Sequence, residues 1–384
     1  MTQRAIVNDG SSEYNVLVAP WSRATVFDER DRRISRRDLL ATVGAGVSTA
    51  TAGCSSAVDG NETTTDAATY ANPVREPVVP DPTAIRVDST YYVFASNQDR
   101  EVDDNERLVP VFASEDLVDW EYRGEAFETK PDWKSGHLWA PEIARYDGRY
   151  VLYYSYSLWG DSNPGIGVAT ADSIEGPYTD HGRLFLSSEI GVDNSIDPYF
   201  RVEDGTPYLV WGSFHGIYGV ELTPDSLDWK PGTTFLLGGR AYEAPTIVER
   251  EGYYYLFLST GACCEGLNST YELEVGRAES FVGSYLTRNG TDLRHVDAWG
   301  GTEDPLLTGL GDSRFAGPGH NTVVTDDAGE HWTLYHAYDT TEPGTTDDGA
   351  WRRSLMLDPI TWEDGWPVIG DGTPSERRQV PTIE

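Results

Sequence analysis

Lysine and cysteine are both scarce in this chain of 384 residues. The only lysines are Lys130, Lys134 and Lys230, and 63 Asp and Glu residues outnumber 29 Lys and Arg residues, which gives a formal net charge of −34 at pH 7. A surface of this sign repels phosphate backbones and anionic lipid headgroups, so nucleic acid is excluded as a partner. The acidic residues are spread along the chain rather than gathered in one run, which favours a halophilic protein that stays hydrated in high salt.

The three cysteines are too few for a scaffold built from disulfides. Cys263 and Cys264 are neighbours, and the alpha carbons of ordinary disulfides lie farther apart than those of adjacent residues. We therefore expect no ordinary disulfide between them. The patterns CxxC, HExxH and GxxxxGK[ST] are absent, which leaves zinc-finger, zincin and P-loop interpretations without support. No apolar run after the first sixty positions approaches the roughly 20 residues of a transmembrane helix.

The N-terminal segment has the composition of an export signal. Arg36 and Arg37 precede a short, weakly apolar stretch, as in twin-arginine signals. The stretch ends in small residues before Cys54, which resembles a lipobox with Cys54 as the lipidated residue. An amphipathic helix is the alternative, but glycine and threonine are too frequent here for a good helix. We expect an extracellular protein, exported by the twin-arginine route and touching the membrane only through a lipid anchor. The predicted parts are an export signal with an N-terminal extension (1–53), a flexible tether (54–71) and a folded domain (72–384).

One supersecondary pattern recurs five times after the tether. Each copy has a small or acidic residue usually followed by proline, an apolar strand, an acidic turn, and a Tyr-rich strand that ends in serine or, in the last copy, histidine. The openings of the five copies are Asp81-Pro82, Ala140-Pro141, Asp197-Pro198, Ala244-Pro245 and His320-Asn321. A second strand pair follows each copy, so the unit is four short strands in about 60 residues, which is typical of a propeller blade. The sequence predicts an all-β, five-bladed β-propeller; a β-sandwich would not explain the matching openings.

Three acidic residues stand at or beside these openings: Asp81, Asp197 and Glu243. The innermost strand of each propeller blade lines the central channel, so the three side chains are expected to converge on one funnel. Converging carboxyls destabilise each other's charged forms and are costly unless they serve a purpose. Glycosidic hydrolysis is such a purpose: one carboxylate activates water and a protonated acid serves the leaving oxygen, about 6.5–9.5 Å apart for inversion. A third carboxylate can keep the acid protonated.

Exposed aromatic rings could complete such a site by stacking on sugar rings. Four tryptophans are candidates for this role: Trp139, Trp159, Trp211 and Trp299. Trp139 is favoured because it directly precedes the second opening.

An ordered set of short motifs resembles glycoside hydrolase family 43, and within it the arabinanase branch. The motifs are Val79-Pro80-Asp81-Pro82, His137-Leu138-Trp139-Ala140-Pro141-Glu142, Asn194-Ser195-Ile196-Asp197-Pro198, Tyr242-Glu243-Ala244-Pro245, Gly261-Ala262-Cys263-Cys264, Gly317-Pro318-Gly319-His320-Asn321 and Asp364-Gly365-Trp366-Pro367. The resemblance implies that Asp81 is the general base, Glu243 the general acid, and Asp197 the residue that orients the acid and raises its pKa. It also implies that His320 holds a hydrated ion, usually calcium, in the channel, while the chemistry itself needs no cofactor.

The resemblance makes an exported, inverting, endo-acting hydrolase of α-1,5-arabinan the leading hypothesis. Trp139, Asn194 and Trp211 are the residues expected to bind the substrate, and the protein is expected to be a monomer. Two alternatives stay open. One is an exo-acting α-L-arabinofuranosidase or β-xylosidase that takes arabino- or xylo-oligosaccharides, and the other is a propeller that captures sugars without cleaving them.

Overall fold

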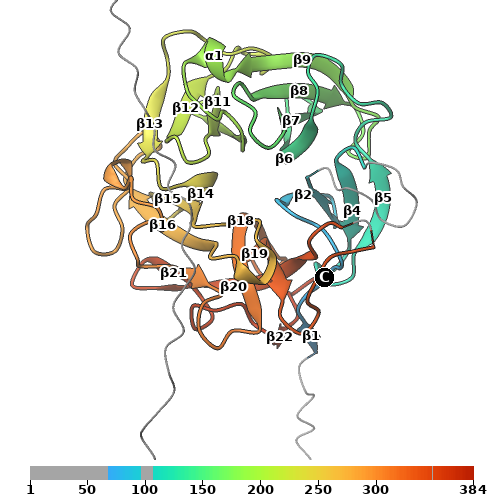
Figure 1. Ribbon diagram of the computed structural model, residues 1–384, viewed down its shortest axis with the longest axis vertical. Helices are drawn as coiled ribbons and strands as arrows, with labels where there is room; N and C mark the ends of the chain where they lie inside the picture. The colour runs from blue at the N-terminus through green and yellow to red at the C-terminus, as the bar shows by residue number, and fades with distance from the viewer. Residues whose placement is uncertain (1–67, 97–106, 348) are drawn as a thin grey trace, which may run out of the picture. The chain divides into compact units, whose positions relative to one another are not determined.

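The computed structural model describes residues 68–96, 107–347 and 349–384 (Figure 1). The predicted export signal and Cys54 lie outside the described residues. One boundary changes: residues 69–71, assigned to the tether from sequence, form strand β1 (Thr69–Ala71), so regular structure begins before residue 72. In the described part of the chain, no helix is both long and apolar enough to cross a membrane.

Five four-stranded antiparallel sheets are arranged in a ring (Figure 1), as the repeats predict. Blade 1 has β2 (Thr83–Val87), β3 (Thr90–Phe94), β4 (Pro110–Ser114) and β5 (Glu121–Glu125). Blade 2 has β6 (His137–Tyr146), β7 (Arg149–Ser157), β8 (Gly165–Ala171) and β9 (Thr179–Leu186). Blade 3 has β10 (Tyr199–Glu203), β11 (Thr206–Trp211), β12 (Ile217–Glu221) and β13 (Phe235–Gly238). Blade 4 has β14 (Glu243–Arg250), β15 (Tyr253–Thr260), β16 (Glu272–Ala278) and β17 (Leu307–Thr308). Blade 5 has β18 (Phe315–Thr325), β19 (His331–Asp339), β20 (Arg353–Glu363) and β21 (Trp366–Ile369). The described helices are short: α1 (Ser187–Ile190), η1 (Gly266–Asn268) and η2 (Leu293–His295).

The first two strands of each blade are joined by the acidic turns seen in the sequence. At Asp147-Gly148, Asp204-Gly205 and Glu251-Gly252 both turn residues have positive φ angles, as a type I′ turn requires. This turn twists with its flanking strands and sets their register, so it fixes the inner strand against the second strand in blades 2, 3 and 4.

The ring of blades closes without a gap, because each inner strand contacts the inner strand of the next blade and β18 contacts β2. The two ends of the domain reinforce this closure. Strand β1 pairs antiparallel with β22 (Arg377–Gln379). The buried amide of Asn72 accepts a hydrogen bond from the backbone N–H of Leu357 at 2.9 Å and donates one to its carbonyl at 2.9 Å, which ties the N-terminal segment to β20.

Candidate active site

The five repeat openings share one unusual backbone conformation. Each opening residue is non-glycine and has a left-handed φ angle: Asp81 (52°), Ala140 (41°), Asp197 (60°), Ala244 (54°) and His320 (51°). Non-glycine residues rarely adopt this region, so its recurrence at five equivalent positions shows a feature built into every blade. The strand pairing shifts register beside the openings in β6, β14 and β18.

A ring of hydrogen bonds connects each opening to the end of the second strand in the preceding blade. At four openings the backbone N–H donates to a side chain there: Ala140 to Ser96 Oγ (2.8 Å), Asp197 to Ser155 Oγ (2.9 Å), His320 to Ser259 Oγ (2.9 Å) and Asp81 to His336 Nδ1 (3.1 Å). The remaining opening differs. Ser213 instead donates its hydroxyl to Glu243 Oε2 at 2.7 Å, and the N–H of Ala244 is directed to the carboxylate of Asp197. The hydrogen bonds that join neighbouring blades at the openings therefore also orient Glu243 and Asp197.

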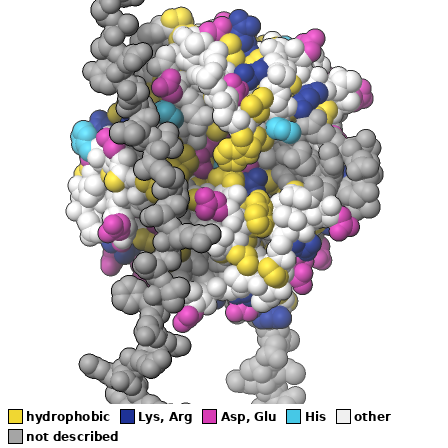
Figure 2. Space-filling model, in the orientation of Figure 1, with side chains coloured by type: hydrophobic (Ala, Val, Ile, Leu, Met, Phe, Trp, Pro, Cys, Tyr) yellow, Lys and Arg dark blue, Asp and Glu magenta, His cyan; other side chains and the backbone are white. Residues whose placement is uncertain are grey.

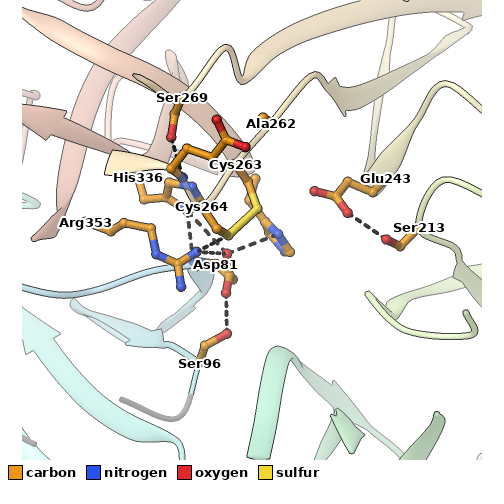
Figure 3. The surroundings of a disulfide bond; sticks show 12 residues. Asp81, Ser96, Ser213, Glu243, Ala262, Cys263, Cys264, Ser269, His336 and Arg353 are labelled. Atoms are coloured by element: carbon orange, nitrogen blue, oxygen red, sulfur yellow. Dashed lines mark hydrogen bonds and ion pairs between the residues drawn. A yellow bond between two sulfur atoms is a disulfide. The ribbon is translucent and has the colours of Figure 1, made fainter. Parts of the chain in front are cut away.

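Asp81 is surrounded by one arginine, two histidines and one serine (Figure 3). Its Oδ1 lies 3.2 Å from Arg353 Nη1, 3.3 Å from His336 Nδ1 and 3.5 Å from His320 Nδ1, and Ser96 donates a hydrogen bond to Oδ2. Burial alone would raise the pKa of Asp81, but Arg353, with smaller contributions from the two histidines and Ser96, lowers it well below the usual range. Asp81 is therefore ionised at neutral pH, as a base that accepts a proton from water must be.

Glu243 and Asp197 are perturbed in the opposite direction. Both side chains are buried, with 7% and 5% of their surfaces exposed. Burial raises the pKa of Glu243 to about 7, against the opposing hydrogen bond from Ser213, and the charge of Asp81 adds to the increase. Burial and the negative charges of Glu243 and Asp81 raise the pKa of Asp197 well above its usual value. The pair therefore retains a proton close to neutral pH, while Asp81 does not.

Figure 3 shows Glu243 with one carboxylate oxygen pointing towards the space beside Asp81 and the other bound by Ser213. The third predicted acid, Asp197, lies close enough to both for the charges of Glu243 and Asp81 to act on it, so the structure brings the three acids together. Asn194 contacts the site indirectly, because its Nδ2 donates to the carbonyl oxygen and Oγ of Ser213 at 3.1 and 3.0 Å. The sequence pointed to Asn194 as a substrate ligand, whereas its hydrogen bonds are those of a residue that positions Ser213.

The prediction that Trp211 stacks on sugar is wrong. Its side chain is fully buried and its indole N–H donates to Ser195 Oγ at 3.0 Å. The ring packs against Phe185 at 5.0 Å between blades 2 and 3, so neither of its faces is open to a ligand. By contrast, Trp139 is half-buried and lies 5.8 Å from the indole of Trp159, which is 77% exposed.

A second aromatic pair contains one residue that the sequence pointed to and one that it did not. Trp299, one of the four candidates, is 64% exposed and stacks on Phe214 at 4.6 Å. Phe214 directly follows Ser213, and its N–H donates to the carbonyl of Tyr242 at 2.8 Å, which places the pair beside the loop that carries Glu243. Figure 2 shows one face of the molecule, on which hydrophobic side chains gather near the middle.

Cys263 and Cys264 were expected to form no ordinary disulfide, and the structure shows a disulfide between sequence neighbours instead. They are joined to each other, with alpha carbons 3.8 Å apart. The usual spacing of half-cystines describes residues distant in the chain, whereas two neighbours can close a small ring through their own side chains.

Arg353 and His336 were not predicted as site residues. His336 had a signal, because it occupies the place of the strand-ending serine in the fifth repeat, but Arg353 had none.

Cleavage of a glycosidic bond needs one carboxylate that activates water and one carboxylic acid that protonates the leaving oxygen, and this funnel supplies both. The fold and the funnel together place the protein among the carboxylate-dependent glycosidases. Comparison with known proteins makes the assignment specific. The chain belongs to the glycosyl hydrolases family 43, whose sequence profile matches residues 70–367. The predicted family, propeller fold and glycosidase class are thereby confirmed.

Relatives in this family include both modes of attack. The chain is 33% identical over 303 residues to an extracellular endo-alpha-(1->5)-L-arabinanase of Bacillus subtilis, a match that covers 75% of this chain and 86% of the relative. It is 30% identical to an extracellular exo-alpha-(1->5)-L-arabinofuranosidase of Cellvibrio japonicus, with 76% and 86% covered. Among solved structures, a Cellvibrio cellulosa alpha-L-arabinanase complexed with arabinohexaose matches with a TM-score of 0.65 and 29% identity, covering 77% of this chain and 96% of the other.

Proposed function

We propose that the protein is an inverting endo-arabinanase that hydrolyses α-1,5-linked arabinan. The observation that carries this proposal is the pair of opposite pKa shifts in one funnel, down at Asp81 and up at Glu243. An ionised base and a protonated acid can then coexist at the same pH, which single-displacement hydrolysis requires. The endo-arabinanase among the relatives supports the choice of substrate.

The proposed reaction is a single displacement at the anomeric carbon. Asp81 accepts a proton from a water molecule as the water oxygen bonds to that carbon from the face opposite the leaving group. Glu243 donates its proton to the glycosidic oxygen as the carbon–oxygen bond breaks, so the configuration inverts. Asp197 takes no part in bond formation; as the second buried carboxyl beside Glu243 it favours retention of one proton by the pair, and the N–H of Ala244 orients its carboxylate.

Two aromatic pairs on different blades, each with one exposed member, support binding of a polymer rather than one sugar. Trp139 and Trp159 belong to blade 2, whereas Phe214 and Trp299 come from the loops after β11 and β16. Aromatic faces at separate places along the funnel mouth can hold successive sugar rings on both sides of the cleaved bond. The exo-acting relative keeps exo cleavage as the alternative.

The deciding experiment compares variants on two substrates. Glu243→Ala should lose turnover of debranched arabinan by about 10²–10⁴-fold and retain much of its activity on an aryl arabinofuranoside with a very good leaving group, which needs no protonation. Asp81→Ala should lose both activities, and Glu121→Ala, whose side chain is 77% exposed on an outer strand, should lose neither. Normal arabinan hydrolysis by Glu243→Ala would refute the assignment of the acid.

Product size separates the remaining possibilities. Mixed oligosaccharides in the first minutes of arabinan hydrolysis support endo action, and monosaccharide alone supports exo action. Binding of arabinan without release of reducing ends would mean that the propeller only captures sugars. Sedimentation of the same preparation tests the proposed monomer.

The cellular setting is also a proposal. Export by the twin-arginine route, with Cys54 as a lipid anchor, is supported by the N-terminal motif and by the extracellular relatives. Replacing both Arg36 and Arg37 by lysine should stop export, and Cys54→Ser should release active protein into the medium. Unchanged export of the arginine variant would refute the twin-arginine signal, and continued attachment of Cys54→Ser to the cell would refute the lipid anchor. The charge of −34 supports adaptation to high salt, so activity is expected to rise with salt concentration.

A calcium ion near His320 stays a proposal with narrower support. The side chain of His320 is 13% exposed and its Nδ1 faces Asp81, but the described residues include no group of three His, Cys, Asp or Glu side chains that could hold a metal ion. Calcium prefers six to eight oxygen ligands, so His320 would supply one ligand and water the rest. Such an ion would contribute positive charge to the channel. Loss of thermal stability on chelation, restored by calcium, supports it; an unchanged melting temperature removes it.

A further inference from the structure

The Cys263–Cys264 disulfide lies beside the base, and the proposed reaction gives it no role (Figure 3). It belongs to the loop between β15 and β16, which is tied down at several points. The hydroxyl of Tyr338 donates to the carbonyl of Cys263 at 2.8 Å, and the N–H of Ala262 donates to Thr270 Oγ1 at 3.1 Å. The loop therefore holds the two sulfur atoms in a fixed place rather than leaving them on a free rim.

One guanidinium nitrogen links this disulfide to the base. Arg353 Nη1 lies 3.2 Å from Asp81 Oδ1 and 3.7 Å from Cys264 Sγ. A guanidinium nitrogen of this kind carries two hydrogens in a rigid plane, so one can be directed to the carboxylate and the other to the sulfur. Sulfur is a weak acceptor. Its main effect is steric, because it fills the space into which the arginine head would otherwise turn.

Opening the disulfide would release this constraint. In the bonded pair the two side chains share one small ring, whereas two separate thiols rotate independently about their Cα–Cβ bonds. Among the described residues, Arg353 is the only arginine or lysine within ion-pair distance of Asp81. A freer Arg353 therefore means a less well placed Asp81.

We propose that the Cys263–Cys264 disulfide is a positioning element of the active site, which holds Arg353 against the general base Asp81. The inference rests on the proposed function, because it takes Asp81 as the base. It assigns the disulfide no bond-making step: the sulfur atoms neither touch the reacting atoms nor change oxidation state during turnover. An oxidising extracellular setting would keep the bond closed.

The test uses the double variant Cys263→Ser/Cys264→Ser and, independently, wild-type protein treated with a phosphine reductant. Both should lower kcat by about tenfold, since small misplacements of catalytic groups have effects of this order or larger. The loss should be equal on arabinan and on the aryl arabinofuranoside, because the base acts on both, and KM should change little. Reoxidation should restore the reduced wild type. Leu267→Ala, in the same loop and 40% exposed, is the matched control and should keep full activity.

Arg353→Lys provides the second arm, since lysine keeps the charge but cannot reach carboxylate and sulfur in one plane. It should lose kcat on both substrates, and the cysteine substitutions should cost nothing further in that background. An unchanged kcat after reduction overturns the proposal. So does a rise in KM alone, which would make the disulfide a sugar-binding surface, or a loss confined to arabinan, which would implicate the acid. If wild-type protein cleaves the aryl substrate but not arabinan, the proposed function fails while the aryl arm still tests the disulfide.

Discussion

Ser213 offers a quantitative test of how the funnel tunes its acid. Its hydroxyl donates to Glu243 Oε2 at 2.7 Å, and its own position is fixed by Asn194. The hydrogen bond favours the charged form of Glu243 and so holds its pKa down against the effect of burial, at about 7. Ser213→Ala removes the donor without changing the backbone, so the pKa of Glu243 should rise further.

The size of the shift follows from the strength of the bond. A hydrogen bond to a charged group contributes about 1.5–3 kcal/mol, and one pKa unit corresponds to about 1.4 kcal/mol. The alkaline limb of kcat/KM on arabinan, which reports the acid in the free enzyme, should therefore move upward by roughly one unit or more. At low pH the variant should lose some activity, because Glu243 is less well oriented.

The assay is a pH profile of initial rates on arabinan and on an aryl arabinofuranoside with a very good leaving group. The second substrate needs no acid and should show no alkaline limb from Glu243 in either protein. Ser114→Ala is the matched control, because it also removes a buried hydroxyl that donates to a carboxylate, here Asp116 Oδ1 at 2.9 Å, in a strand that carries none of the three acids. An alkaline limb that stays in place in Ser213→Ala would refute the idea that this hydrogen bond sets the pKa of Glu243.

Three further substitutions test other parts of the structure. Trp211→Ala should reduce the free energy of unfolding by about 3–5 kcal/mol in a denaturant titration, because it empties a fully buried site; a loss of affinity without a loss of stability would contradict this. Trp299→Ala should leave stability unchanged and raise KM for long arabinan chains several-fold; an unchanged KM would exclude it from the substrate path. Glu142→Gln should remove part of the pH dependence of stability. Burial raises the pKa of Glu142 to about 7, against hydrogen bonds from Thr83 and Phe200. Protonated Glu142 therefore contributes stability that is fully present below about pH 4.5 and is lost as the pH rises through 7. An unchanged decline of the melting temperature across that range would refute the assignment to Glu142.

The fold and the positions of the acids could be predicted because both are periodic. Strands, Asp-Gly turns and openings recur, and a repeat assigns equivalent places to equivalent residues even when it says nothing of their contacts. The same logic failed at Trp211, since the last three residues of β11 are all buried and alternation at this end of the strand does not indicate which side faces a ligand. It also failed at Arg353, which comes from the third strand of the fifth blade and has no counterpart in the repeat. Arg353 contacts Asp81 because blade 5 packs against blade 1 where the ring of blades closes.

The hydrogen-bonded ring at the blade openings has a consequence for how the protein tolerates change. Base and acid stand on different blades, so the gap between them is a property of the whole circle rather than of any local segment. A substitution that widens one seam between blades separates the reacting groups even if every catalytic side chain is intact. Loss of function should then arise from sites scattered around the propeller, and activity should report the tightness of the ring more sensitively than melting does.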